Sequence, residues 1–189
     1  MMSTLRLPRP APDESAPFYH DYIAEVGGEN VGQQFVDQLA EVERLYSGLD
    51  DDRALMRYAP GKWSIKEILG HLIDAERIFS YRLLCVSRGD ATPLPGFDEQ
   101  VYVPAGRFDD RPLSTLTAEF RLVRLSSVAL IGGLPAAAFS SWGQASGHRI
   151  TARALVYIIL GHASHHLRVL RSRYGVGTEA NRISVGAES

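Results

Sequence analysis

The chain has 189 residues, a length that suits one domain with a substantial buried core. Hydrophobic residues make up 45%, charged residues 22%, and the net charge is −2, so the composition indicates a soluble globular protein with no electrostatic reason to bind nucleic acid or a membrane. Cys85 is the only cysteine, which excludes an internal disulfide and a thiolate-cluster zinc site. A metal site would therefore use nitrogen and oxygen ligands.

Residues 1–28 are predicted to form a loose arm with one short amphipathic segment. Residues 1–17 are rich in proline and contain no apolar core of the signal-peptide type, which predicts a cytoplasmic protein. The amphipathic segment covers residues 18–26 and ends at Gly27 and Gly28. His20, within it, repeats no ligand spacing and is expected to be a surface or partly packed residue.

The first long helix is predicted to start after Asn30, a favourable N-cap residue. Its inward positions recur every three or four residues, as in an amphipathic helix. They are Val31, Phe35, Gln38 or Leu39, Val42, Leu45 or Tyr46, and Leu49. The acidic triplet at 50–52 is expected to end the helix as a solvated loop.

The second helix has the clearest start, because Ser64 and Glu67 form a capping box. It is predicted to run to about residue 88. His71 lies on the flank of its apolar face, which in a bundle faces the next helix. Glu76 falls inside the apolar stripe, so its carboxylate is expected either to pair with an arginine or to face a polar cavity. Asp74 projects outward.

A long connection, residues 91–112, follows the second helix and is expected to pack as a flap over one end of the bundle. The third helix starts at Ser114 or Thr117 and stops at the glycine pair 132–133. Residues 136–150 have no regular pattern, and His148 within them is expected to be an exposed loop residue. No convincing sheet is predicted.

The fourth helix is predicted from about Thr151 to Tyr174, with Gly175 as its stop and residues 176–189 as a polar tail. His162 and His166 lie one turn apart, near the centreline of its apolar stripe. Buried imidazoles need partners, since an unsatisfied buried polar group costs about 1–3 kcal/mol. The predicted fold class is all-α, a four-helix bundle over residues 29–175.

The H-x-x-x-H spacing lets two ring nitrogens reach one ion. It differs from the H-E-x-x-H motif of metalloproteases, because Ala163 follows the first histidine. A third nitrogen must come from elsewhere, and His71 is the remaining histidine on the four predicted long helices. His165 forms no i, i+4 pair and is expected at the edge of the stripe, where it contacts the ligands or controls access to them.

Two stretches resemble the DinB-like (DinB/YfiT-like) superfamily of four-helix-bundle metalloenzymes: WSIKEILGHLIDAE at 63–76 and GHASHH at 161–166. The resemblance covers about residues 31–174. It implies a three-histidine site with one ligand on the second helix and an i, i+4 pair on the fourth. His71 matches the first ligand, and His162 and His166 match the pair. Asp74 matches a polar position that recurs three residues after the first histidine.

The resemblance also implies one divalent metal ion, nickel, zinc or iron, and often a homodimer. Its members include thiol S-transferases and amide-type hydrolases. Three neutral histidines leave coordination positions open, as in catalytic sites, so we expect a metal-dependent enzyme that activates water or a thiol for reaction with a small-molecule substrate. Glu76 is the candidate catalytic base, or else a nearby residue that accepts a hydrogen bond from a metal ligand. Arg168 is a candidate anchor for a substrate carboxylate, although a solvated arginine is more common there.

Two other hypotheses remain open from the sequence. One is a non-catalytic protein of stress-response type that binds a metal or a small ligand. The other is a plain helical bundle in which the histidines satisfy one another and water. A cavity with room for substrate beside the histidines favours an enzyme, whereas a site plugged by Phe97, Trp142 or the long connection favours a binding protein.

Overall fold

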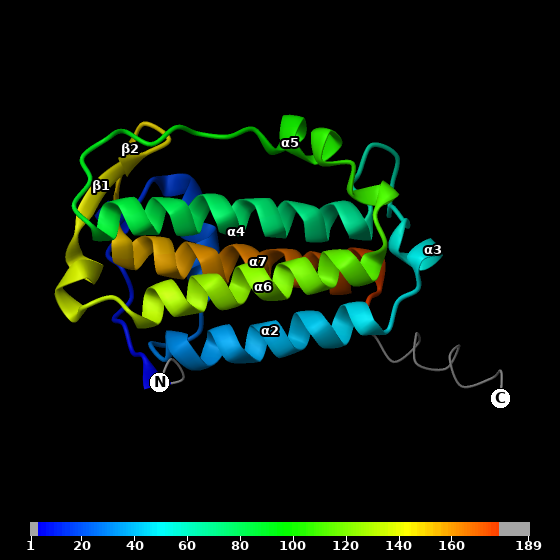
Figure 1. Ribbon diagram of the computed structural model, residues 1–189, viewed down its shortest axis with the longest axis horizontal. Helices are drawn as coiled ribbons and strands as arrows, with labels where there is room; N and C mark the ends of the chain where they lie inside the picture. The colour runs from blue at the N-terminus through cyan, green and yellow to red at the C-terminus, as the bar shows by residue number, and fades with distance from the viewer. Residues whose placement is uncertain (1–3, 178–189) are drawn as a thin grey trace.

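The computed structural model describes residues 4–177, and four long helices lie side by side in it (Figure 1). They are α2 (Val31–Ser47), α4 (Ile65–Ser87), α6 (Leu113–Gly132) and α7 (Ala152–Tyr174). The short helices are α1 (His20–Glu25), α3 (Asp51–Ala54) and α5 (Glu99–Gly106). The all-α four-helix bundle is thus confirmed, while the acidic triplet at 50–52 contributes to a short helix rather than an irregular loop.

Local capping interactions set the ends of the long helices close to where the sequence places them. The side chain of Asn30 accepts a hydrogen bond from the backbone N–H of Gln33 at the start of α2. Ser64 and Glu67 form the predicted capping box at the start of α4. Gly175 ends α7 with a φ of 65°, a left-handed conformation that glycine adopts without strain.

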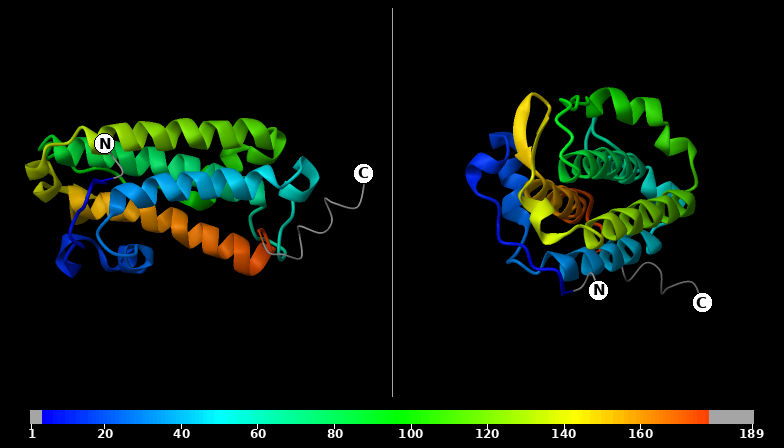
Figure 2. Two further views of the ribbon diagram at one scale, coloured as in Figure 1. Left: turned by 90° about the horizontal axis from the view of Figure 1, so that it is seen from below. Right: turned by 60° about the vertical axis from the view of Figure 1, so that its left-hand side comes forward.

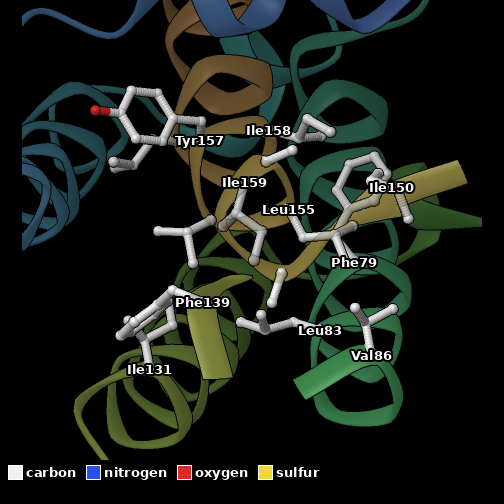
Figure 3. Close-up of a cluster of buried hydrophobic side chains, with 14 of the residues drawn as sticks. Phe79, Leu83, Val86, Ile131, Phe139, Ile150, Leu155, Tyr157, Ile158 and Ile159 are labelled. Atoms are coloured by element: carbon white, nitrogen blue, oxygen red, sulfur yellow. The ribbon is translucent and has the colours of Figure 1, made fainter. Parts of the chain in front are cut away.

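The bundle core consists of two apolar clusters with a polar layer between them. One cluster contains Phe79, Leu155 and Ile159, among others (Figure 3). The other contains Leu72 and Phe120. Between them each long helix contributes at least one buried polar side chain: Gln38 from α2, His71 and Glu76 from α4, Arg124 and Ser127 from α6, and His162 from α7. The candidate site lies in this layer.

The amino-terminal arm is packed against the bundle, so the prediction of a loose arm was wrong. Leu7 is only 6% exposed, and helix α1 lies beside α7 (Figure 2). Glu14 accepts a hydrogen bond from the hydroxyl of Thr151 and forms an ion pair with Arg153. The prolines of this segment start short 3-10 turns, Pro12–Glu14 and Pro17–Tyr19, instead of preventing order.

The long connection does not form a flap over one end of the bundle. It starts at the C-terminal end of α4, and α5 runs back beside that helix (Figure 1). Near the other end the ring of Phe108 packs on Gly70, where a Cβ atom would lie 2.2 Å from the Phe108 Cγ atom. Glycine at position 70 is therefore what allows the connection to lie flat on α4.

Residues 142–151 form a β-hairpin, which corrects the expectation of no sheet. Strands β1 (Trp142–Ala145) and β2 (His148–Thr151) pair antiparallel. The two turn residues, Ser146 and Gly147, both have positive φ angles, 52° and 79°, as a type I′ turn requires. His148 is exposed on this hairpin, as expected for a surface residue.

None of the helices between residues 4 and 177 combines the length and the hydropathy needed to span a lipid bilayer. Most of the polar tail expected at 176–189 lies outside the described residues, which end at Gly177. The proposed division into arm, bundle and tail stays a prediction.

Candidate metal centre

Three histidine side chains converge in the polar layer. His71 comes from α4, and His162 and His166 come from adjacent turns of α7. One ring nitrogen from each lies within 4.8 Å of the other two, and the Nε2 atoms of His71 and His162 are 2.9 Å apart. His71 and His162 are each 5% exposed, and His166 is half-buried. The structure thus brings together the three residues that the sequence selects.

The environment keeps these imidazoles neutral in the absence of a metal. Burial lowers the pKa of His71 from 6.5 to about 4. Burial also lowers the pKa of His166 well below its ordinary value, as does the neighbouring His71. Burial also lowers the pKa of His162, and the charge of Arg124 contributes to the lowering. All three rings can therefore offer a lone pair near neutral pH.

This donor set fits a borderline divalent ion. Zinc and related ions bind imidazole nitrogens at about 2.0–2.1 Å, which places two ligand nitrogens about 3 Å apart. The 2.9 Å separation of the His71 and His162 Nε2 atoms matches this spacing. Without an ion, a nitrogen pair at this distance needs one ring to donate its N–H to the other. The three residues could therefore hold one metal ion with little movement.

Aromatic rings surround the histidines and restrict their orientation. The Trp63 ring lies 4.8 Å from that of His71, measured between centroids, and stacks on His166 at 6.4 Å. Tyr22 from α1 meets His162 edge-on at 5.2 Å. Gly161 allows this approach, since a Cβ atom there would lie 1.8 Å from the carbonyl oxygen of Tyr22. The arm therefore contributes to the site as well as to the fold.

Glu76 occupies the first of its two expected environments, an ion pair with an arginine. Arg124 is fully buried, and its Nε and Nη2 atoms donate hydrogen bonds of 2.8 Å to the two Glu76 carboxylate oxygens. Arg124 also donates to the side chain of Gln38, which donates in turn to the Leu160 carbonyl and the Ser164 hydroxyl. This hydrogen-bond network thus reaches Leu160 and Ser164, which lie on either side of His162 in the sequence. The role of Glu76 as a base stays a prediction.

The other candidate residues lie outside the cluster. His165 is half-buried beside Tyr22, where its Nδ1 atom is 3.2 Å from Arg168. Arg168 is 57% exposed and pairs with Glu25 at 2.7 Å, which is the solvated environment considered for it. Asp74 is 3.9 Å from Arg77. His20 contacts the carbonyl of Pro12 at 3.0 Å.

A cavity of about 480 Å³ opens onto the three histidines. Aromatic side chains form most of its wall, namely Phe18, Tyr19, Tyr22, Trp63, Phe79 and Phe97. Its polar residues apart from the histidines include Arg82, Glu99 and Ser146. Phe97 lies in the wall without filling the space, and Trp142 does not line it. The site is therefore not plugged.

Arg82 and Arg124 are two buried residues that the sequence analysis missed. Both lie at helical spacing from apolar core residues, Arg82 three residues after Phe79 and Arg124 four after Phe120. This spacing is the signal that would have identified them, because a charged residue inside an apolar stripe needs a buried partner or a ligand.

The fold and the histidine cluster together define a helical-bundle protein with a three-histidine candidate metal centre. The chain belongs to the DinB superfamily, whose family model matches residues 34–170. A comparison with curated protein sequences gives no significant match.

Two solved structures share the fold. YfiT from Bacillus subtilis, described as a probable metal-dependent hydrolase with an unusual four-helix bundle topology, aligns with a TM-score of 0.65 at 16% identity, over 94% of this chain and 100% of its own. A mycothiol-dependent maleylpyruvate isomerase aligns with a TM-score of 0.60 at 12% identity, over 84% of this chain and 61% of its own. At these identities the likeness establishes the fold alone.

Proposed function

We propose that this protein is a metal-dependent enzyme that acts on a small molecule, with His71, His162 and His166 holding one divalent ion, nickel, zinc or iron. The observation that carries the proposal is the convergence of three neutral imidazoles, with nitrogens within 4.8 Å, at the wall of an open cavity. A purely structural site would be closed by a fourth protein ligand. An open cavity beside the ligands favours an enzyme over a binding protein.

The bound ion would supply Lewis acidity, which activates water or a substrate thiol. The chain's own residues would position the reactants. Trp63 and Tyr22 fix the ring planes of the ligands, and the aromatic wall excludes bulk water around an apolar substrate. The two structural relatives, a probable metal-dependent hydrolase and a mycothiol-dependent isomerase, support water and thiol chemistry respectively.

For Glu76 we propose a positioning role in this reaction rather than direct proton transfer. Both carboxylate oxygens are engaged by Arg124, and the same arginine holds Gln38 against the backbone and side chain next to His162. A carboxylate held in this way orients the metal-ligand helix. Homodimer formation and a cytoplasmic location stay predictions from the resemblance and the amino-terminal sequence.

Metal analysis tests the proposed site. Protein purified without a histidine tag should contain about one equivalent of metal per chain, and the His162→Ala variant should lose it. His148→Ala, which removes an exposed histidine on the hairpin, is the matched control and should retain the metal. Equal metal content in wild type and His162→Ala, or none in wild type after incubation with nickel, zinc or iron, would overturn the assignment.

A substrate screen tests the activity. Thiol transfer from glutathione, bacillithiol and mycothiol should be measured beside hydrolysis of a panel of amides and esters, each with and without chelator. A chelator-sensitive reaction in either group supports the enzyme. A flat result across the panel, with metal present in the protein, would favour the non-catalytic binding protein.

A further inference from the structure

Arg82 is a buried cation with no anionic partner in the described part of the chain. Its side chain is among the largest fully buried ones, at 1% exposure. Its guanidinium donates hydrogen bonds to the Tyr19 hydroxyl at 3.1 Å, the Pro95 carbonyl at 2.6 Å and the Ser146 hydroxyl at 3.1 Å. All three acceptors are neutral, and together they use three of the five N–H donors that an arginine has.

Arg124, the other fully buried arginine, provides the contrast. Arg124 has Glu76 as a counter-ion, as buried charges in proteins ordinarily do. Glu99 is the acidic residue that lines the same cavity as Arg82, but these two described residues form no ion pair. The charge of Arg82 is therefore not balanced by an anion among the described residues, and a carboxylate from a ligand would complete its environment.

The position of Arg82 relative to the histidines suits a small ligand. Arg82 follows His71 by 11 residues on α4, which is three helical turns, so both side chains leave the same face of the helix about 16 Å apart at the backbone. Both side chains line the same cavity. Phe79 lies between, 5.6 Å from the His162 ring centroid and 5.8 Å from the Arg82 guanidinium carbon.

We propose that Arg82 binds the carboxylate of the substrate, and that the substrate is a small acid whose apolar part contacts the aromatic wall while its reacting end reaches the histidines. The rings of Phe79 and Phe97 flank the guanidinium, with centroids 5.8 and 6.0 Å from its central carbon, and the Arg82 side chain lines the cavity. The identity of the reacting end rests on the proposed function, whereas the assignment of Arg82 as the acid-binding residue does not.

Calorimetric titration with a matched pair of probes tests the proposal. 3-Phenylpropionate carries the carboxylate, and 3-phenylpropanamide has the same shape without the charge. Wild-type protein should bind the acid at least about tenfold more tightly than the amide, because hydrogen bonds to charged groups are the stronger ones. Arg82→Gln should remove this preference and leave amide binding and metal content unchanged. Arg88→Gln, at the exposed C-cap residue that follows α4, should keep it.

The titrations are run on metal-loaded and chelator-treated protein, because a carboxylate can also bind a metal. A preference that depends on Arg82 in both forms supports the proposal, even if the protein holds no metal and the proposed function fails. Equal binding of the two probes by wild type, or a preference that survives Arg82→Gln, would overturn it. If Arg82→Gln does not fold, Arg82→Lys decides, with an expected severalfold loss of acid affinity; unchanged affinity would contradict the assignment.

Discussion

The buried ion pair between Glu76 and Arg124 should be a major determinant of stability. The side chain of Arg124 is 0% exposed and that of Glu76 is 4% exposed, and three N–O contacts of 2.8–3.0 Å join them. Removing one partner leaves the other charge buried, which costs about 3–5 kcal/mol. Since domains are typically stable by about 5–15 kcal/mol, Glu76→Gln should remove a large share of the total.

Urea unfolding followed by far-UV circular dichroism measures this loss, on metal-free protein so that ion binding does not contribute. Glu43→Gln is the matched control, because Glu43 pairs with Arg121 at the surface, where the two side chains are 36% and 55% exposed. The control should lose less than about 1 kcal/mol. Replacing both buried partners, as in Glu76→Leu with Arg124→Met, should recover stability relative to either single variant.

The same variant separates the two roles considered for Glu76. A catalytic base predicts that Glu76→Gln lowers turnover while the free energy of unfolding changes by less than about 1 kcal/mol. The ion pair predicts the larger loss of stability, together with weaker metal binding, because Arg124 loses the carboxylate that fixes it where it holds Gln38 beside Ser164. A fully stable Glu76→Gln protein would refute the reasoning from burial.

Three further outcomes follow from the site. Gly161→Ala should destabilise the protein by about 1–3 kcal/mol, because the new Cβ would lie 1.8 Å from the Tyr22 carbonyl oxygen. Gly48→Ala, where the nearest contact of the new Cβ is 3.8 Å, should have a much smaller effect. Equal melting temperatures for the two variants would contradict this. Metal-free protein should lose stability as the pH falls from 6.5 towards 4, by about 3 kcal/mol for His71 alone. The pKa of His71 is about 4 in the folded protein and 6.5 in the unfolded chain, so the unfolded chain takes up the proton first. A urea midpoint that does not change between pH 7 and pH 5 would refute the assigned burial. Chelation should lower the melting temperature of wild type and leave that of His162→Ala unchanged, and a shift in both would place the metal elsewhere.

The long helices could be predicted from sequence because their signals are local. Asn30, the Ser64 and Glu67 box, and Gly175 act within one turn of the helix ends they define. The apolar spacing between those ends indicates which face is buried. His162 and His166 were likewise predictable as a pair, since i, i+4 positions on a helix are neighbours whatever the rest of the fold does.

The arm and the hairpin could not be predicted in the same way. The arm is ordered by contacts with distant parts of the chain, such as the Tyr157 hydroxyl donating to the Leu7 carbonyl at 2.8 Å. Proline-rich composition contains no information about such partners. The hairpin has strands of four residues, too short for a reliable alternation of polar and apolar positions, and its turn uses Ser146 at a positive φ, where Asn or Asp is more usual.

The burial of Arg82 and Arg124 was harder to predict than the histidine pair, because it depends on how the helices are aligned. Each helix, taken alone, shows an apolar stripe with one or a few polar exceptions, and an arginine on a stripe is normally interpreted as a surface residue whose stem packs. The exceptions become a layer only when the four helices are aligned, because Gln38, Glu76, Arg124 and His162 then lie between the same two apolar clusters. A charge buried in such a layer needs a partner. Arg124 finds one in Glu76, whereas Arg82 has no anionic partner among residues 4–177, and this contrast is what supports a carboxylate ligand for Arg82.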